Sequence, residues 1–384
     1  MRIPIFIVCI FLFLYGAMNY YVGLRGWQAL SRLLAGGASV VYWCVIVFAA
    51  SSVFLGMFLG NRLLLPEKLR EILTIAGFYW LVFLLYLFLA FVVLDLGRFM
   101  NRWLRLLPDS ATFPPLTAVT VILLLVAGII VYGVWNAQNI KIRHYEVEIN
   151  KNAGNIEELQ LVMVSDLHMG NIVNRKRISR MVEMVNGFNP DLIVIPGDII
   201  DGNLSPYLEQ NMNGEIGKLK AKLGVWGVFG NHDYIGGIAS ESQRLLREAG
   251  VTVLRDEYRL VEGSFYLVGR EDVSSSRLGG QLRRPLAEIM AGMDMDMPIL
   301  LLDHQPFNLD EGREQGVDLQ LSGHTHHGQL FPFNLLTANL FEQDWGYLSK
   351  DSFLLIVSCG FGTWGPPLRI GSVSEIVTVT VRFK

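Results

Sequence analysis

The sequence LQLVMVSDLH at residues 159–168 combines the pattern of a buried strand with that of a ligand site. Residues 159–165 are mostly apolar, and the run has the length of an ordinary strand. Such a run is typical of a strand whose sheet is covered on both faces. Asp166 and His168 follow it directly, at the carboxyl end, where open α/β sheets gather their ligands. The stretch therefore predicts an α/β domain with a functional site at this sheet edge.

Four more blocks of the same kind follow, each with carboxylate, amide or imidazole side chains after a short apolar run. They are LIVIPGDIID (residues 192–201), VFGNHD (228–233), LLDH (301–304) and SGHTHHG (322–328). Six of the seven histidines follow such a run directly or by a few residues. Glycines in the blocks permit the sharp turns that bring side chains together. The pattern predicts one site assembled from several strand ends.

The rest of the same region alternates short β-branched runs with polar helical stretches. Strands are expected at residues 159–165, 192–196, 225–229, 251–254, 265–268, 299–302, 319–322, 353–357 and 376–381. Helices are expected at about 175–186, 210–223, 241–249 and 282–290. The order β-α-β-α-β, followed by a strand-rich part, predicts an α/β sandwich of mixed sheets.

Residues 1–139 differ sharply in composition from the remainder of the chain. They contain 9 Lys and Arg and 4 Asp and Glu, against 23 and 31 in residues 140–384. Apolar runs at about 3–21, 39–59, 72–96 and 116–135 are each long enough to cross a hydrocarbon core of about 30 Å as a helix. Tyr and Trp lie near several run ends, as they do at membrane interfaces. The sequence predicts a transmembrane region of four helices at 1–139, and hence a multi-pass protein of the cell membrane.

The charges leave the membrane side of the remaining residues open. The loops on one side hold six Lys or Arg residues and the opposite loops hold five. This excess of one basic residue leans toward a cytoplasmic position for residues 140–384. The positive-inside rule needs a clear excess of Lys and Arg on one side. Residues 140–384 have a net charge of −8 (23 minus 31). That charge argues against a nucleic-acid partner, because such surfaces are basic.

The residue types in the five blocks suit a pair of metal ions. Hydrolysis of a phosphoester needs charge neutralisation and a hydroxide at neutral pH, and two cations about 3.5–4 Å apart can supply both. They need a bridging carboxylate and a mixed shell of imidazole and oxygen, which suits Mn, Fe, Zn or Co better than Mg or Ca. Asp166 and His168 are two residues apart, as are His324 and His326. Past a strand end, each pair can converge on one ion.

The five blocks resemble the signature of the calcineurin-like metallophosphoesterase superfamily: D-x-H, G-D-x-x-D, G-N-H-D, a lone His, and G-H-x-H. All five are present in order between Asp166 and His326. The segment GHTHHGQ at 323–329 and the ending at 360–369 look like a branch whose members are often membrane-anchored. The resemblance covers residues 156–384 and implies an αββα sandwich of mixed sheets there. Residues 140–155 are expected to be a linker.

The resemblance also implies a centre of two divalent metal ions, among which Mn is favoured. The expected ligands are Asp166, His168 and His326 for one ion, Asn231, His304 and His324 for the other, and Asp198 as the bridge between them. The reaction implied is in-line attack on phosphorus by metal-bound hydroxide, with no covalent enzyme intermediate.

Five further residues are candidates for roles around the metals. The resemblance implies that His232 is a general acid or a donor to a phosphate oxygen, that Asp233 orients it, and that Asp201 braces the loop. His327 stands where the branch commonly has glycine, and either contacts the substrate phosphate or packs outside the cleft. Arg369 either reaches a phosphate or lies on the surface of a Pro-rich turn.

Two segments have alternative interpretations. Residues 330–340 (LFPFNLLTANL) are unusually apolar for a loop. They either lie against the bilayer and form a groove for an acyl or prenyl chain, or form a strand and short helix packed on the core. The basic run at 174–177 is either a solvated helix face or a contact for anionic headgroups.

The leading functional hypothesis is a membrane-anchored dimetal phosphoester hydrolase, acting as a phosphodiesterase, phosphatase or pyrophosphatase. Its place at a membrane favours a lipid-linked phosphate or pyrophosphate as substrate. The alternative substrate is a soluble ester of the nucleotide type. The alternative of another class is a catalytically silent sensor that binds metal or lipid. No feature of the sequence indicates the oligomeric state.

Overall fold

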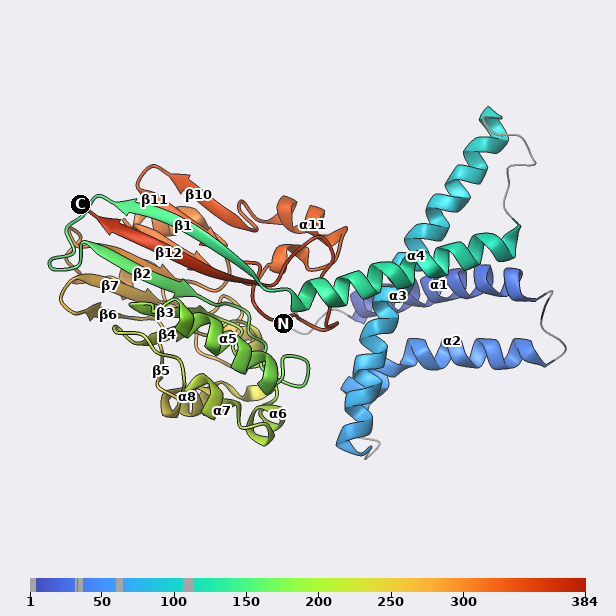
Figure 1. Cartoon of the computed structure of the whole chain (residues 1–384), viewed down its shortest axis with the longest axis horizontal. Coiled ribbons are helices and arrows are strands. Elements are labelled where there is room, and N and C mark those ends of the chain that lie inside the picture. The colour runs from blue at the N-terminus through green and yellow to red at the C-terminus, as the bar shows by residue number, and fades with distance from the viewer. Residues whose placement is uncertain (1–4, 32, 34–36, 60–64, 106–113) are drawn as a thin grey trace. The chain divides into compact units, whose positions relative to one another are not determined.

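The computed structural model describes residues 5–31, 33, 37–59, 65–105 and 114–384 (Figure 1). The described residues form two compact units, Met1–Gly133 and Val134–Lys384. The first is helical, and the second is built from two sheets with flanking helices. The last turn of the fourth long helix belongs to the second unit.

Four long apolar helices make up the described part of the first unit. They are α1 (Ile5–Leu30), α2 (Ala38–Phe54), α3 (Glu67–Leu104) and α4 (Pro115–Gln138), and a π-helical turn, η1 (Leu55–Leu59), extends α2. Their most apolar 18-residue windows have mean hydropathies of 2.0 to 2.6. The four expected helices are therefore confirmed as candidate membrane spans. Residues 3–4 of the first expected span lie outside the described residues.

Two of these helices are longer than their apolar runs. α1 continues to Leu30 and α3 runs from Glu67 to Leu104, where ends at about residues 21 and 96 were expected. A polar residue in the extension of α1, Arg25, pairs with Asp95, which lies near the end of the expected run of α3. The same Asp95 carboxylate accepts a hydrogen bond of 2.5 Å from Tyr21 Oη. Such pairing lets α1 continue where hydrophobicity alone predicts an end.

The described residues of the second unit contain two six-stranded sheets, both mixed (Figure 1). The first has the order β1 (Lys141–Ile149), β12 (Glu375–Phe383), β2 (Glu158–Met163), β3 (Leu192–Pro196), β4 (Val225–Val228), β5 (Val251–Val253). The second has the order β10 (Gly346–Lys350), β11 (Phe353–Val357), β9 (Leu319–Ser322), β8 (Ile299–Leu302), β7 (Phe265–Gly269), β6 (Glu257–Val261). β2, β3, β4 and β5 are parallel neighbours, as are β7, β8, β9 and β11.

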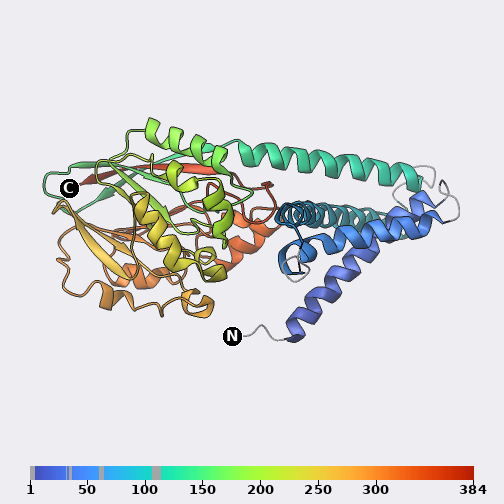
Figure 2. The ribbon, with the colours of Figure 1, turned by 90° about the horizontal axis from the view of Figure 1, so that it is seen from below.

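The two sheets pack face to face, and helices cover both outer faces (Figure 2). Leu161 and Val194 of the first sheet share one buried cluster with Leu300 and Leu321 of the second. The outer face of the first sheet packs on α5 (Arg175–Gly187), α6 (Leu204–Glu209), α7 (Met212–Ile216) and α8 (Ala239–Glu248). The outer face of the second packs on α9 (Leu286–Ile289) and α10 (Leu309–Glu314). The expected αββα sandwich of mixed sheets is confirmed.

Strands β1, β6 and β10 were not expected, and each lies at an edge of its sheet. β1 falls in residues 140–155, expected to be a linker, and pairs with β12 over its whole length. Edge strands leave polar side chains in solvent, and β1 is largely exposed up to Glu146. Their sequences therefore lack the continuous apolar run by which the central strands were found.

Two expected helices are also shorter in the structure. Residues 210–223 hold only α7, which ends before Gly217, while α6 precedes them. Residues 282–290 hold only α9, which begins directly after Pro285. Glycine is unfavourable inside a helix, which is consistent with the end of α7 before Gly217. Proline fits best at the start of a helix, which is consistent with the start of α9 after Pro285.

Candidate metal centre

The expected ligand residues lie at the carboxyl ends of central strands in both sheets. Asp166 and His168 follow β2, Asp198 follows β3, and Asn231 follows β4, and these strands are adjacent and parallel. In the second sheet, His304 follows β8, while His324 and His326 follow the adjacent strand β9. Because the ends of parallel neighbours meet at one sheet edge, the fold brings residues far apart in sequence together.

The backbone at these positions is strained. Among the seven expected ligands, all within the described residues, five have positive φ between 47° and 73°: Asp166, His168, Asp198, His324 and His326. Such conformations are uncommon for residues other than glycine and cluster at functional sites. Gly230 is required by close approach, since a Cβ there would lie 2.6 Å from both the Asp198 backbone nitrogen and His304 Cδ2. These backbone conformations therefore bring the expected ligand side chains together.

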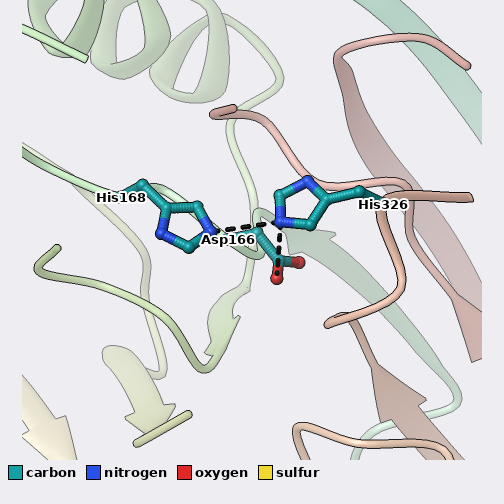
Figure 3. Close-up of side chains that lie close together, drawn as sticks. All are labelled: Asp166, His168 and His326. Carbon is teal, nitrogen blue, oxygen red and sulfur yellow. Dashed lines mark hydrogen bonds and ion pairs between the residues drawn. The ribbon is translucent and has the colours of Figure 1, made fainter. Parts of the chain in front are cut away.

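Asp166, His168 and His326 form the first cluster of possible ligands (Figure 3). All three are buried. The Nε2 atoms of His168 and His326 lie 3.1 Å apart, and His326 Nε2 is 3.6 Å from Asp166 Oδ1. Two imidazole nitrogens and a carboxylate oxygen that converge in this way form a donor set for one divalent cation.

Asp198, His304 and His324 form a second cluster, with ligand atoms within 4.8 Å of one another. His304 Nε2 lies 3.3 Å from Asp198 Oδ2. His304 Nδ1 donates a hydrogen bond of 2.9 Å to the Pro196 carbonyl, which leaves Nε2 for another partner. Asp198 is also 3.6 Å from His168 Nε2 of the first cluster, so its carboxylate lies between the two.

The residues present fit a pair of metal ions. Asn231 Oδ1 and His304 Nε2 are buried and have no hydrogen-bond partner within the described part of the chain. Buried polar atoms normally have a hydrogen-bond partner. A buried oxygen acceptor without one, among other possible ligand atoms, therefore indicates a position that can bind a cation. A mixed set of imidazole, amide and carboxylate donors suits divalent transition metals.

Two of the imidazoles are already in the form that binds a metal, whereas His304 would release a proton when a cation binds. Burial would lower the pKa of His304, but the Asp198 and Asp166 carboxylates raise it well above its ordinary value. Burial lowers the pKa of His324 to about 3, and the charge of His304 adds to the effect. Burial and the neighbouring Arg369 guanidinium lower the pKa of His326 well below its ordinary value. Both imidazoles are therefore neutral at pH 7, which is the form that binds metals. Burial would raise the pKa of Asp198, but the positive charge of His304, whose Nε2 lies 3.3 Å away, outweighs it and lowers the pKa well below its ordinary value, so the carboxylate is ionised.

The structure exchanges the roles expected of Asp201 and Asp233. His232 Nδ1 donates a hydrogen bond of 2.9 Å to Asp201, so Asp201 orients the ring. The buried Asp233 carboxylate instead accepts hydrogen bonds from the backbone N–H groups of Ile199, Ile200 and Gly230. Asp233 thereby connects the loops after β3 and β4. This loop-bracing role was expected of Asp201.

His232 lies at the rim of the two clusters. Its ring centroid is 4.7 Å from that of His168 and 6.2 Å from that of Trp364. Burial alone would lower the pKa of His232, but the hydrogen bond to Asp201 and nearby carboxylate charges raise it to about 8. A divalent cation nearby would lower this pKa again. His168, Asp198 and His232 also lie close enough to form a third possible ligand group.

Arg369 is fully buried, which corrects the expectation of a position on the surface of a Pro-rich turn. Its Nη2 atom lies 3.0 Å from His326 Nδ1 and donates to the carbonyl oxygens of Cys359 and Gly362, each at 2.7 Å. The guanidinium therefore positions His326 and the turn that follows β11.

His327 packs beside the site and is tied to a neighbouring helix. Its Nδ1 atom lies 2.8 Å from Asp344 Oδ2, and its ring centroid is 5.3 Å from that of Trp345. Thr337 Oγ1, in α11 (Phe333–Leu340), donates to the same Asp344 oxygen at 2.6 Å. His327 has φ 47°, a conformation that suits the glycine common at this position. The histidine thus links α11 to the loop that carries His326.

Two arginines of the basic run at residues 174–177 have partners within the protein, although Arg175 and Lys176 are exposed. Arg175 forms an ion pair of 2.7 Å with Glu215. Arg177 Nη2 donates to the carbonyl oxygen of Ala137, at the end of α4, and to that of Phe361, each at 2.8 Å. Basic side chains stabilise the free carbonyls at a helix C-terminus. Arg177 therefore caps α4.

Sequence reasoning missed Asn136, which fastens the last turn of α4 to the site. Asn136 Nδ2 donates to the carbonyl oxygens of Arg369 at 3.0 Å and Ser372 at 2.8 Å, and the residue is buried. The available signal was an amide directly after an apolar run. Asp344 and Trp364 were also missed, because their proximity to the site depends on loop geometry that no motif encodes.

Comparison with known proteins bears on the chemistry of this site. The family model for the calcineurin-like phosphoesterase matches residues 159–328. A transmembrane protein with metallophosphoesterase domain from Danio rerio is 30% identical over 318 residues, covering 79% of this chain and 71% of that protein. An uncharacterized metallophosphoesterase from Aquifex aeolicus (strain VF5) is 33% identical over 250 residues, covering 64% of this chain and 93% of that protein. The first match covers more of the chain than Val134–Lys384 contains, so the similarity extends into the helical region.

Proposed function

The chain belongs to the calcineurin-like phosphoesterase family and is a metal-dependent phosphoester hydrolase, and from this we propose that its substrate is a phosphate or pyrophosphate carried by a lipid. The observation that carries the proposal is the presence, in one chain, of a buried donor set for two metals and four helices apolar enough to cross a membrane. Membrane spans keep a site within reach of the bilayer, where lipid headgroups are concentrated.

We assign the ligands from the two clusters and the orphaned amide. Asp166, His168 and His326 would hold one ion, and His304, His324 and Asn231 the other, with the Asp198 carboxylate shared between them. When bound, the two ions would neutralise charge on the phosphoryl group and supply an activated water. The mixed nitrogen and oxygen donors favour Mn, Fe, Zn or Co, and Mn is the first ion to test.

The remaining residues of the site would orient the substrate and move a proton. His232, held by Asp201 through Nδ1, presents Nε2 as a donor to a phosphate oxygen or to the leaving group. Asp233 keeps the loops after β3 and β4 in register, so that His232 and Asp198 stay in one arrangement. The His232 backbone N–H donates to Asp198 Oδ1 at 2.8 Å, which couples the two groups directly.

A substrate panel tests the proposal. Full-length protein purified in detergent with added Mn should hydrolyse lipid pyrophosphates or phosphoglycolipids with a kcat/KM at least about tenfold above that for a nucleotide or a small chromogenic diester, a preference worth about 1.4 kcal/mol. Turnover of the soluble esters alone would instead assign the substrate to the nucleotide class. Two bound metals without turnover of any compound would favour a sensor.

A further inference from the structure

Helix α11 (Phe333–Leu340) presents an apolar face to its surroundings. None of the eight residues of this helix is buried. Phe333, Leu336 and Leu340 are spaced three and four residues apart, so they lie on one side of the helix. With Leu335 and Phe331 they form a surface, here called the α11 face, whose side chains are 44 to 62% exposed. Exposed apolar clusters of this kind usually mark a binding surface.

The α11 face is coupled to the candidate metal centre. Thr337, on α11, and His327, one residue after the expected ligand His326, both contact Asp344 Oδ2. On the other side of the site, Phe341 directly follows the helix, and its ring centroid is 6.0 Å from that of His324. The helix therefore directs its polar contacts toward the metal ligands and leaves its apolar side chains exposed.

The same face begins beside the end of a candidate membrane span. The Phe331 backbone N–H donates to the Ile370 carbonyl at 2.6 Å, and the Ile370 N–H donates to that of Gln329 at 2.9 Å. Ile370 lies between Arg369 and Ser372, the two residues whose carbonyls accept from Asn136 in the last turn of α4. Figure 1 shows α11 at the end of the sandwich where β1 begins, directly after α4.

We propose that the α11 face lies in the interfacial layer of the bilayer that α4 crosses. The apolar run of α4 ends at Trp135, a residue type typical of the interface, and Asn136 follows it. A helix rises about 1.5 Å per residue, so Asn136 lies just past that boundary, and it is hydrogen-bonded to the segment 369–372, to which Phe331 is paired. Residues 330–340 carry no charge, although residues 140–384 have a net charge of −8 (23 minus 31). An uncharged apolar helix at this depth fits the acyl and headgroup boundary.

This placement defines the access route to the site. A substrate phosphate anchored by a lipid tail would reach His324 and His326 from the headgroup layer, past the α11 face, without leaving the bilayer. That consequence rests on the proposed function, whereas the membrane contact itself does not. The two are therefore tested by separate measurements.

The contact is tested by the depth of a fluorescent label on full-length protein in phosphatidylcholine proteoliposomes. The exposed Cys9 and Cys44 are first replaced by serine, and the buried Cys359 is retained. An environment-sensitive label at Leu336→Cys should be quenched by lipid-borne nitroxide and shielded from iodide. The same label at Leu282→Cys, 80% exposed on a loop of the same unit, should show the reverse. Equal iodide quenching at both positions would overturn the proposal.

The access route is tested by substrate preference. The variant Phe333→Ser/Leu336→Ser/Leu340→Ser should lower the ratio of kcat/KM on vesicle-borne lipid phosphates to that on a small chromogenic ester by about tenfold, since it removes three apolar side chains from the contact. The matched control, Leu208→Ser/Leu260→Ser/Leu282→Ser, changes three other exposed leucines and should leave the ratio unchanged. If the ratio is unchanged in the α11 variant while the label at Leu336→Cys is shielded from iodide, the access route is rejected and the membrane contact is retained. Loss of all turnover in the unmutated chain would reject the proposed function instead.

Discussion

Replacing Asp198 by asparagine should abolish phosphoester hydrolysis while leaving the fold intact. The Asp198 carboxylate lies between the two ligand clusters, 3.3 Å from His304 Nε2 and 3.6 Å from His168 Nε2. An amide keeps the shape and can still accept the hydrogen bond from the His232 N–H. It cannot supply the negative charge that two adjacent cations need. We expect kcat to fall by about 10³-fold or more, since a single electrostatic contact to the reacting group is already worth 10²–10³.

The metal-free Asp198→Asn protein should unfold more easily than the unmutated chain at pH 7, because the pKa of Asp198 is lowered in the fold by the charge of His304 and an amide leaves that charge without its partner. Asp318→Asn is the matched control. Asp318 is also largely buried, but it pairs with Lys151 at 2.9 Å and accepts from the Ile299 N–H at the opposite end of the strands. It should keep both its activity and its unfolding free energy, since burial raises the pKa of Asp318 and an amide oxygen can still accept from the Ile299 N–H. Thermal unfolding and turnover measured together separate the two patterns. Full activity in Asp198→Asn would refute the bridging role.

His232→Ala should lose most turnover and keep its metals. His232 faces the clusters from the rim, and Asp201 fixes its ring through Nδ1. Removal of a positioned acid or base typically costs 10²–10⁴-fold, so we expect kcat to fall by about that factor. Metal content, measured by mass spectrometry after dialysis, should stay at two ions per chain.

The metal content of His232→Ala also decides between two structural roles. His168, Asp198 and His232 lie close enough to share an ion, so a ligand role would appear as the loss of one metal. His144→Ala serves as the control, because that imidazole is exposed on β1 and contacts Thr378. It should change neither turnover nor metal content. A fall to one metal in His232→Ala would move this residue from proton transfer to coordination.

The central sheets and the ligand clusters could be predicted because the same residues define both. A continuous apolar run such as 192–196 marks a strand buried on both faces, and Asp198 after it marks the strand end. The carboxyl ends of parallel neighbouring strands lie at the same edge of a sheet. Residues that follow different strands, such as His168 and His326, can therefore be assigned to one site although they are far apart in the sequence. The edge strand β1 was not predicted, because its solvent-facing side chains are polar.

The surroundings of the site could not be predicted, because they depend on which side chains meet across loops. Asp201 and Asp233 both follow strand ends, and sequence order does not tell which of them bonds to His232 and which to backbone N–H groups. Arg369 lies in a Pro-rich turn that could equally be exposed, whereas its burial follows from carbonyl groups of residues 359–362 folding around it. Side-chain polarity indicates a contact but does not select its partner.

A titration of metal-stripped, full-length protein with Mn, followed by both metal binding and turnover of a chromogenic ester, tests the dinuclear centre directly. We expect two Mn ions per chain, activity that rises as the second ion binds, and a spin-coupled Mn pair by electron paramagnetic resonance. Asp198→Asn should show neither the coupled pair nor the activity. A single Mn site with full activity, or turnover that persists in excess chelator, would contradict a dinuclear centre built from these residues.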